Sequence, residues 1–211
     1  MFSSIIITIF TLIVLLFSVI IHELAHGYVA YSLGDSTAKY AGRLTINPLK
    51  HLDPFGSVFL PLMLLLITSG QGPVFGWAKP VPINPYNLKD QKWGTLKVAI
   101  SGPASNFAIA IIFGLIIRFL GLPQTVPFIE LIGIIVIYNL LWGLFNLMPI
   151  PPLDGSWILF RFLPEKWRYA KIFLQQYGMV ILIFFIFFNG FYFLSSLSNM
   201  LYGIIVGNSF F

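Results

Sequence analysis

The sequence predicts an all-α membrane protein that crosses the bilayer several times. Hydrophobic residues make up 58% of its 211 residues and charged residues only 9%, whereas soluble domains carry about 25% charged residues. Long apolar segments alternate with shorter stretches that hold most of the basic residues. We therefore expect about five spanning helices within a single integral membrane domain that covers residues 1–211.

The first helix is expected over residues 3–33. Residues 5–21 contain no charged side chain, and Gly34-Asp35 supplies a stop signal. The segment lacks the basic start and the small-residue cleavage site of a signal peptide, so we expect it to be retained. His22 lies roughly 27 Å along such a helix at about 1.5 Å per residue, close to the far face of a hydrocarbon core about 30 Å thick.

Less regular regions follow the first helix. Residues 40–46 alternate polar and apolar side chains, which predicts a short interfacial β-strand. Residues 55–69 are apolar but few and contain Pro61, which favours a re-entrant or tilted helix over a full span. Repeated prolines in residues 70–92 exclude a regular helix and predict an interfacial loop.

Four further spans are predicted in the rest of the chain, at about 94–120, 128–147, 169–189 and 191–207. A short extra helix from Asp154 to Leu163 follows a proline-rich break after the second of these spans. The polar motifs lie within about 3–163, so we expect the helices of about 169–207 to be additional C-terminal elements.

Basic residues predict the orientation of the chain in the membrane. One group lies between the first helix and the 94–120 span, another follows the 128–147 span, and residues 121–127 contain none. The positive-inside rule then places both groups in the cytoplasm and the N-terminus outside, provided that residues 55–69 dip in and return on the same side. A full crossing at 55–69 would move part of the first group outside. The two groups are Lys39, Arg43, Lys50, Lys79, Lys89, Lys92 and Lys97, and Arg161, Lys166, Arg168 and Lys171.

The segment His22-Glu23-Leu24-Ala25-His26 is an H-E-x-x-H motif inside an apolar helix. Positions i and i+4 of a helix lie one above the other, so both imidazoles can reach one metal ion. Glu23 can act as a general base toward a water at that metal. A pair of neutral histidines is the alternative, but ionisable side chains within an apolar helix are costly and usually functional. The motif therefore predicts a metal site near the cytoplasmic end of the first helix.

A third ligand is required, because catalytic zinc usually takes three protein ligands. Asp154 ends an apolar stretch that starts at Asn146 and whose prolines interrupt the helix. Irregular backbone at membrane depth is tolerated where it is buried in protein or lines a cavity, which favours Asp154 as the ligand. Asp154 could instead only cap the helix that begins at Gly155. We interpret His51 and Asp53 as interfacial residues of a solvated loop.

The segment Gly102-Pro103-Ala104-Ser105-Asn106 starts its span at the same expected depth as the two histidines and Asp154. Its small residues are of the kind that let membrane helices pack closely. A direct chemical role for Asn106 is equally compatible with the sequence. We expect the segment to position its span against the first helix.

These three motifs resemble the signatures of the site-2 protease family of intramembrane zinc metalloproteases. The resemblance runs from about residue 18 to 160 in the family's order, and the loop from Trp77 to Pro85 resembles the compact prokaryotic branch. No segment is long and polar enough for the PDZ or CBS domains that other members carry. The matching residues are His22-Glu23-x-x-His26, Gly102-Pro103-x-x-Asn106 and Asn146-x-x-Pro149-x-Pro151-x-x-Asp154-Gly155.

The resemblance implies one Zn²⁺ per chain, held by His22, His26 and Asp154. It also implies that Glu23 activates the zinc-bound water and that Asn146 is a polar group near the scissile peptide. Two histidines and one carboxylate would also suit Fe(II) or Co(II). The implied substrate is a membrane protein or peptide, hydrolysed within or near its transmembrane segment. The implied location is a prokaryotic cell (inner) membrane, with the active site near the cytoplasmic face.

Other functions are compatible with parts of the sequence. A non-catalytic membrane metal-binding or transport protein is one, although a transporter places ionisable residues along a path through the bilayer and residues 5–21 have none. Hydrolysis of a lipid or prenylated substrate is another, and no residue favours it. We expect no nucleic-acid partner, because no stretch combines dense basic residues with aromatic ones. The absence of Cys excludes disulfides and thiolate ligands.

Overall fold

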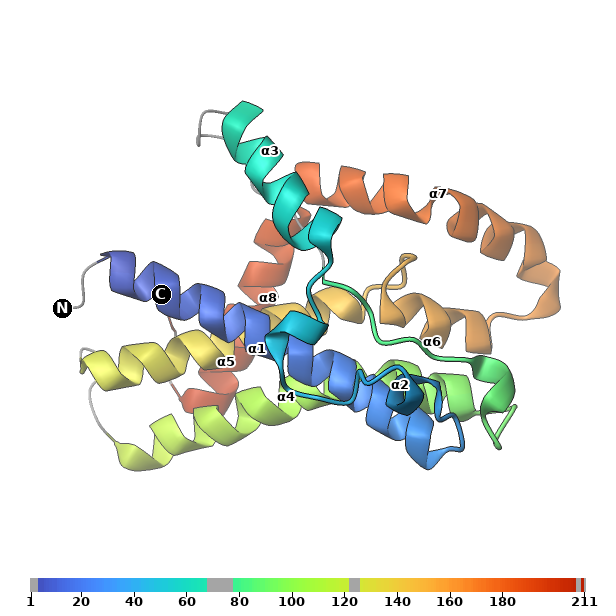
Figure 1. Cartoon of the computed structure of the whole chain (residues 1–211). Helices are drawn as coiled ribbons and strands as arrows, with labels where there is room; N and C mark the ends of the chain where they lie inside the picture. The colour runs from blue at the N-terminus through green and yellow to red at the C-terminus, as the bar shows by residue number, and fades with distance from the viewer. Residues whose placement is uncertain (1–3, 68–77, 122–125, 208–209, 211) are drawn as a thin grey trace.

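The computed structural model describes residues 4–67, 78–121, 126–207 and 210, and these residues form helices joined by loops (Figure 1). The described residues contain no strand, so the predicted all-α class is confirmed for this part of the chain. Among the described residues, four helices are long and apolar enough to cross a membrane. They are α1 (Ser4–Ser32), α4 (Gly94–Leu120), α5 (Pro127–Asn146) and α7 (Arg168–Phe187), the last of which is preceded by the 3-10 helix η4 (Glu165–Trp167).

The fifth predicted span, at 191–207, corresponds to α8 (Gly190–Val206), an apolar helix of 17 residues. That length is at the lower limit for a spanning helix. Residues 55–69 correspond to the π-helix η2 (Pro54–Phe59) and the eight-residue α3 (Leu60–Ile67). This described part is shorter than the roughly 20 residues that a span requires. Residues 68 and 69, and 70–77 of the predicted loop, lie outside the described part of the chain.

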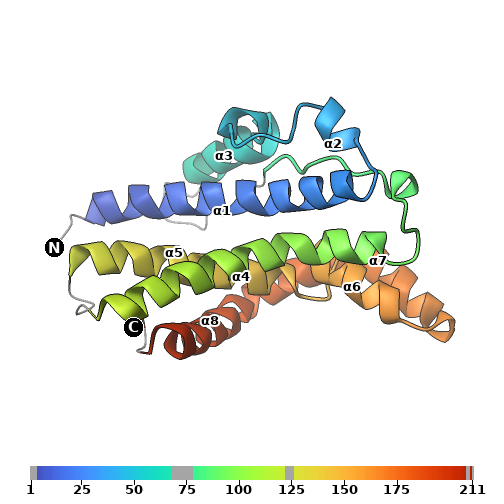
Figure 2. The same cartoon turned by 90° about the horizontal axis from the view of Figure 1, so that it is seen from below.

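Three long helices, α1, α4 and α5, lie side by side and form the body of the bundle (Figures 1 and 2). α8 packs against α4 and α5. A Cβ on Gly114 of α4 would lie only 2.5 Å from Ile205 Cγ2, so a small residue is what lets α8 approach this closely. The core of this region contains Ala110, Ile117, Ile129, Ile132, Val136, Ile137, Leu140, Tyr202 and Val206.

The prediction of a short β-strand at residues 40–46 is wrong. The short helix α2 (Thr37–Tyr40) occupies the start of this region. Gly42 then takes a left-handed φ of 63°, and the N–H groups of Gly42 and Arg43 donate to the carbonyls of Lys39 and Ala38 at 3.0 Å each. This closure of a helix end turns the chain. The alternation of side chains carried no information about that turn.

The segment that we call the strap, residues 79–84, runs back along the C-terminal part of α1 and leads through the 3-10 helix η3 (Pro85–Asn87) to α4. Lys79 N–H donates to the carbonyl of His51 at 2.9 Å, just after the 3-10 helix η1 (Pro48–Lys50), and Arg43 Nη2 donates to the Lys79 carbonyl at 2.6 Å. Both backbone polar groups of Lys79, the first residue of the strap, are therefore hydrogen-bonded. The short helix predicted from Asp154 is confirmed as α6 (Asp154–Phe162), which packs against α4.

Candidate metal centre

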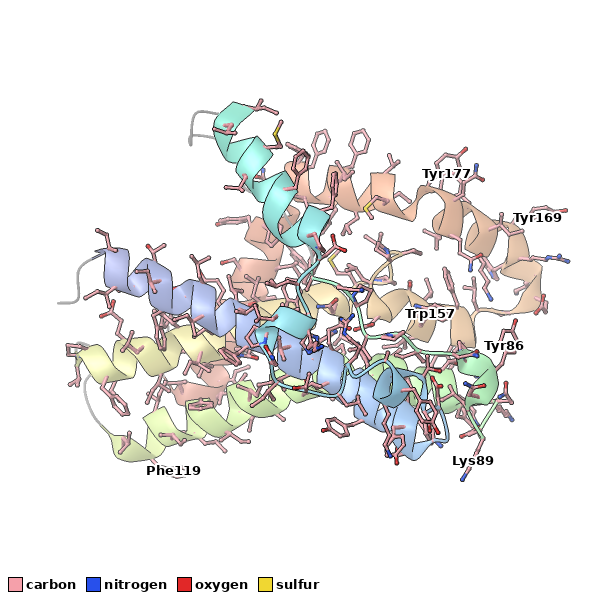
Figure 3. The ribbon with its side chains drawn as sticks, in the orientation of Figure 1. Tyr86, Lys89, Phe119, Trp157, Tyr169 and Tyr177 are labelled. Atoms are coloured by element: carbon pink, nitrogen blue, oxygen red, sulfur yellow. The ribbon has the colours of Figure 1, made fainter. Side chains whose placement is uncertain are left out.

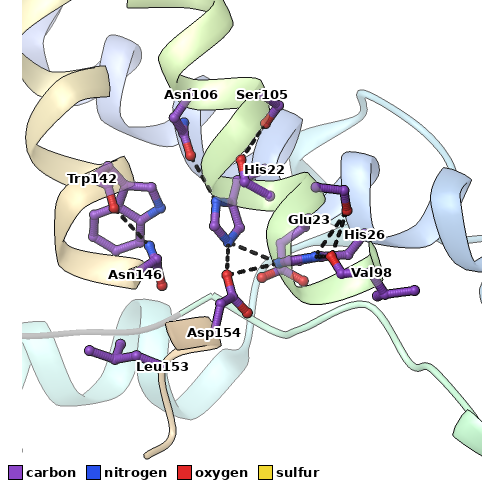
Figure 4. Close-up of polar contacts among 12 residues, drawn as sticks. His22, Glu23, His26, Val98, Ser105, Asn106, Trp142, Asn146, Leu153 and Asp154 are labelled. Carbon is purple, nitrogen blue, oxygen red and sulfur yellow. Dashed lines mark hydrogen bonds and ion pairs between the residues drawn. The ribbon is translucent and has the colours of Figure 1, made fainter. Parts of the chain in front are cut away.

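Three potential ligand atoms from two distant parts of the chain converge on one point (Figure 4). The Nε2 atoms of His22 and His26 lie 3.0 Å apart, and Asp154 Oδ2 lies 3.0 Å from the first and 3.1 Å from the second. The two imidazoles are almost closed to solvent, whereas the Asp154 side chain is 19% exposed. The group is therefore reached from the side of Asp154.

The two imidazoles come from consecutive turns of α1 and are oriented by α4. His26 Nδ1 lies 2.7 Å from the backbone carbonyl of Val98, and His22 Nδ1 lies 2.7 Å from Asn106 Oδ1. A carbonyl oxygen only accepts hydrogen bonds, so Nδ1 carries the proton in each ring. In a neutral ring with its proton on Nδ1, the Nε2 atom has a lone pair, and both Nε2 atoms point into the site.

Asp154 is the first residue of α6, which begins against the end of α5. A Cβ on Gly155 would lie 2.1 Å from the carbonyl oxygen of Leu147. No residue larger than glycine fits there without a shift of the backbone. This close approach brings the Asp154 carboxylate to the two imidazoles.

These donors fit a divalent metal such as zinc, which binds imidazole nitrogen and carboxylate oxygen. Two imidazole lone pairs and a carboxylate oxygen face one another at about 3 Å in a buried place. They repel one another unless a proton or a cation lies between them. A Cβ on Gly102 would lie 2.4 Å from His26 Nε2 and 2.6 Å from His22 Nε2, so the bare backbone of α4 forms one wall of the site.

Glu23 lies between the two histidines in sequence and contacts the strap. Its Oε2 accepts a hydrogen bond from Val81 N–H at 2.7 Å. Val81 is buried, and the prolines on either side of it have no N–H to offer. One carboxylate oxygen of Glu23 is thus fixed by backbone, and the other carries no hydrogen bond to the strap.

Asp35, beyond the end of α1, anchors the other end of the strap. Its side chain accepts hydrogen bonds from Asn84 N–H at 2.7 Å, Asn87 Nδ2 at 3.0 Å and Thr37 N–H at 3.0 Å, and from the Thr37 hydroxyl. Burial acts to raise the pKa of this carboxyl, but the hydrogen bonds from Thr37, Asn84 and Asn87 outweigh burial and lower the pKa below its usual value.

We expect Asp35→Ala to destabilise the protein by about 1.5–3 kcal/mol at neutral pH, the usual contribution of hydrogen bonds to a charged group. Because the pKa of Asp35 is lower in the folded state, its stabilisation is complete above the unfolded pKa of about 4 and declines as the pH falls toward the folded value. Thermal unfolding measured from about pH 7 down to about pH 2 would follow this decline. Asp90→Ala, which removes an exposed ion pair with Lys97, is the control. An Asp35→Ala midpoint equal to that of the parent at pH 7 would contradict the anchoring role.

The structure brings together His22, His26 and Asp154 and places Glu23 beside them, as the sequence predicted. Asn146, the last residue of α5, donates from Nδ2 to the Trp142 carbonyl at 3.0 Å. The interpretation of His51 as a solvated loop residue is wrong, because the residue is 1% exposed and its Nε2 lies 2.8 Å from the Thr45 carbonyl. His51 is not part of the metal-ligand cluster, as expected.

Sequence reasoning missed two backbone partners of this site, the Val98 carbonyl and the Val81 N–H. A backbone group has no sequence signature, so only the position of Val81 between Pro80 and Pro82 hinted at an isolated donor. Sequence reasoning also left Asn106 open, and the structure places its side chain on His22.

Comparison with known proteins gives consistent matches. The family model described as "Peptidase family M50" matches residues 10–123 and 121–188. The chain is 39% identical over 181 residues to the "Putative zinc metalloprotease YwhC" of Bacillus subtilis, covering 82% of this chain and 78% of that protein. It is 28% identical over 172 residues to the Rip2 protein of Mycolicibacterium smegmatis, which carries the same description, covering 80% and 62%.

A more distant match is to "Zinc metalloprotease MJ0392" of Methanocaldococcus jannaschii, at 29% identity over 163 residues that cover 76% of this chain and 36% of that protein. The chain thus spans less than two thirds of the Rip2 and MJ0392 proteins. No solved structure matches the chain.

Proposed function

The chain belongs to peptidase family M50, the site-2 proteases, and on this premise we propose that it is an intramembrane protease that hydrolyses peptide bonds within or near the transmembrane segments of membrane proteins. Its class is that of a zinc metalloprotease. Membership of a peptidase family favours the enzyme over a metal-transport protein.

One observation carries the proposal: two of the three candidate ligands, and Glu23 beside them, lie on a helix that is long and apolar enough to cross a membrane. Ile5–Ser32 of α1 meets this criterion and holds both histidines and Glu23. Placing ionisable residues within a membrane-spanning helix costs free energy, and such residues usually have a function. A peptide bond cleaved at this centre would lie at membrane depth, as in a transmembrane substrate.

His22, His26 and Asp154 would hold the zinc ion, which when bound supplies a Lewis acid that polarises a carbonyl and activates a water. Glu23 is the general base of the proposed reaction. Its Oε2 is anchored on Val81 N–H, so the carboxylate is held in place while its other oxygen takes the proton of the attacking water. Glu23 then donates that proton to the leaving amine of the substrate.

Asn146 would stabilise the carbonyl oxygen of the scissile peptide as negative charge develops on it. Its Nδ2 has two hydrogens, and the hydrogen bond to the Trp142 carbonyl uses one of them. The second hydrogen is available to a substrate. The bond to Trp142 also fixes the direction of the amide.

We also propose that the chain lies in the cell (inner) membrane with the metal centre near the cytoplasmic face, on the basis of the positive-inside rule. Figure 3 shows Tyr86, Lys89, Trp157 and Tyr169 at one end of the bundle and Phe119 toward the other. Tyr86 and Tyr169 are each 87% exposed. Exposed tyrosine and tryptophan beside basic residues are typical of a membrane–water interface.

Cleavage of a model transmembrane peptide in lipid vesicles tests the proposed function. The purified protein should cleave the peptide within its apolar segment, lose this activity after treatment with a zinc chelator and regain it when Zn²⁺ is added back. A soluble peptide of matched length and polar sequence is the control. Cleavage of the soluble peptide alone, or cleavage that survives full removal of zinc, would contradict the proposal.

A further inference from the structure

A fully buried amide connects His22 on α1 to α4 and α5. Asn106 has no exposed surface, and its Oδ1 lies 2.7 Å from His22 Nδ1. Its Nδ2 donates to the backbone carbonyl of Ser18 at 3.2 Å and to Asn139 Oδ1 at 3.0 Å. Asn139 is 1% exposed, and its own Nδ2 donates to the Ile135 carbonyl at 2.8 Å. All three helices therefore take part in one chain of hydrogen bonds.

The direction of every bond in this chain is fixed by two backbone carbonyls. The carbonyl oxygen of Ile135 can only accept, so the nitrogen of the Asn139 amide must face it, and Asn139 Oδ1 must face Asn106. The Ser18 carbonyl likewise requires the nitrogen of Asn106 on its side. Asn106 Oδ1 is then the atom that faces His22, and the His22 ring must donate from Nδ1.

We propose that Asn106, oriented by Asn139, is a positioning residue of the zinc centre. It holds the His22 imidazole in the tautomer that carries its proton on Nδ1 and turns the Nε2 lone pair toward His26 and Asp154. This inference rests on the proposed function of these three residues as zinc ligands. It assigns a role to the Asn of the Gly102-Pro103-x-x-Asn106 motif and to Asn139, which lies outside all three motifs.

The orientation of the Asn106 amide with Oδ1 toward His22 is the one that gives each neighbouring polar group a hydrogen-bond partner. If the Asn106 amide were reversed, its oxygen would face the oxygens of Ser18 and Asn139, and its nitrogen would face a protonated ring nitrogen. Each of these contacts leaves a buried polar group without a partner, and no exposed surface of Asn106 gives water access to it. His26 needs no such residue, because a backbone carbonyl orients its ring directly.

Zinc affinity tests the proposal. Loss of a group that orients a ligating histidine typically weakens metal binding about 10–100-fold. We expect Asn106→Leu to raise the zinc Kd, measured by competition with a chelator, by such a factor, and Asn139→Leu by a smaller one. Because Asn139 acts only through Asn106, the double variant should bind zinc no more weakly than Asn106→Leu alone. Asn199→Leu on α8 makes the same change in another apolar helix and is the control.

Excess zinc supplies a second readout. At saturating Zn²⁺, Asn106→Leu should recover most of its peptidase activity with an unchanged KM, because neither Glu23 nor Asn146 is altered. If Asn106→Leu fails to fold, Asn106→Ser, whose side chain is too short to reach His22, carries the same expectation. An unchanged zinc Kd in the Asn106 variants, or losses that add in the double variant, would overturn the inference while zinc binding by the parent protein leaves the proposed function standing.

Discussion

Gly102→Ala should remove zinc from the protein and abolish its peptidase activity. The added Cβ would lie 2.4 Å from His26 Nε2 and 2.6 Å from His22 Nε2, far inside van der Waals contact. It projects from the rigid backbone of α4, so the imidazoles must move away. That movement breaks the hydrogen bonds of their Nδ1 atoms to Val98 and Asn106 and separates the Nε2 atoms from Asp154. Zinc content by mass spectrometry and cleavage of a transmembrane peptide would measure both losses.

The loss cannot be attributed to the α4 helix itself, because alanine favours a helix over glycine by about 1 kcal/mol. Gly203→Ala on α8 is the matched control, since a Cβ there meets no heavy atom within 4 Å. We expect that variant to keep its zinc and its activity. A Gly102→Ala protein that holds one zinc per chain and cleaves at the parent rate would contradict the close packing of the two imidazoles against the backbone of α4 at Gly102.

Glu23→Gln should lower the cleavage rate by a factor of about 10²–10⁴, the usual contribution of a general base, while the protein keeps its zinc. The glutamine oxygen can still accept the hydrogen bond from Val81 N–H, so the strap and α1 stay in place. The amide cannot take a proton from water. Glu23→Gln should therefore lose activity and keep its zinc, whereas Gly102→Ala should lose both.

Glu130→Gln, at the start of α5, makes the same chemical change away from the metal centre and should leave cleavage unaffected. An equal loss in both variants would indicate a general effect of removing carboxylates from this chain. Parent-like cleavage by Glu23→Gln would remove Glu23 from the role of base, whatever its zinc content.

The candidate ligands could be predicted because they are residue types that bind metals and they occur at a spacing, or in a local sequence context, typical of metal ligands. His22 and His26 lie one helical turn apart, and Asp154 follows prolines that interrupt a membrane segment. The course of α1 and α6 followed from the same patterns of apolar residues, glycine and proline. The local sequence was sufficient to predict those features that depend on one segment of the chain alone.

The partners of these residues could not be predicted, because they depend on which turns of different helices meet. Gly102 was compatible with any close helix packing until α4 was placed against the two imidazoles. Asn106 was ambiguous because its three hydrogen-bond partners lie on other helices. The strand predicted at 40–46 failed for a local reason, since Gly42 closes a helix end in a left-handed conformation.

The absence of cysteine in this chain allows a direct test of the central claim, that Asp154 joins His22 and His26 around one zinc ion. Asp154→Cys would place the only thiolate of the protein at that position, and X-ray absorption at the zinc edge distinguishes a Zn–S distance of about 2.3 Å from Zn–N and Zn–O distances of about 2.0–2.2 Å. We predict one sulfur neighbour per zinc in Asp154→Cys and none in an Asp35→Cys control. A zinc-loaded Asp154→Cys protein with only nitrogen and oxygen neighbours would contradict the account.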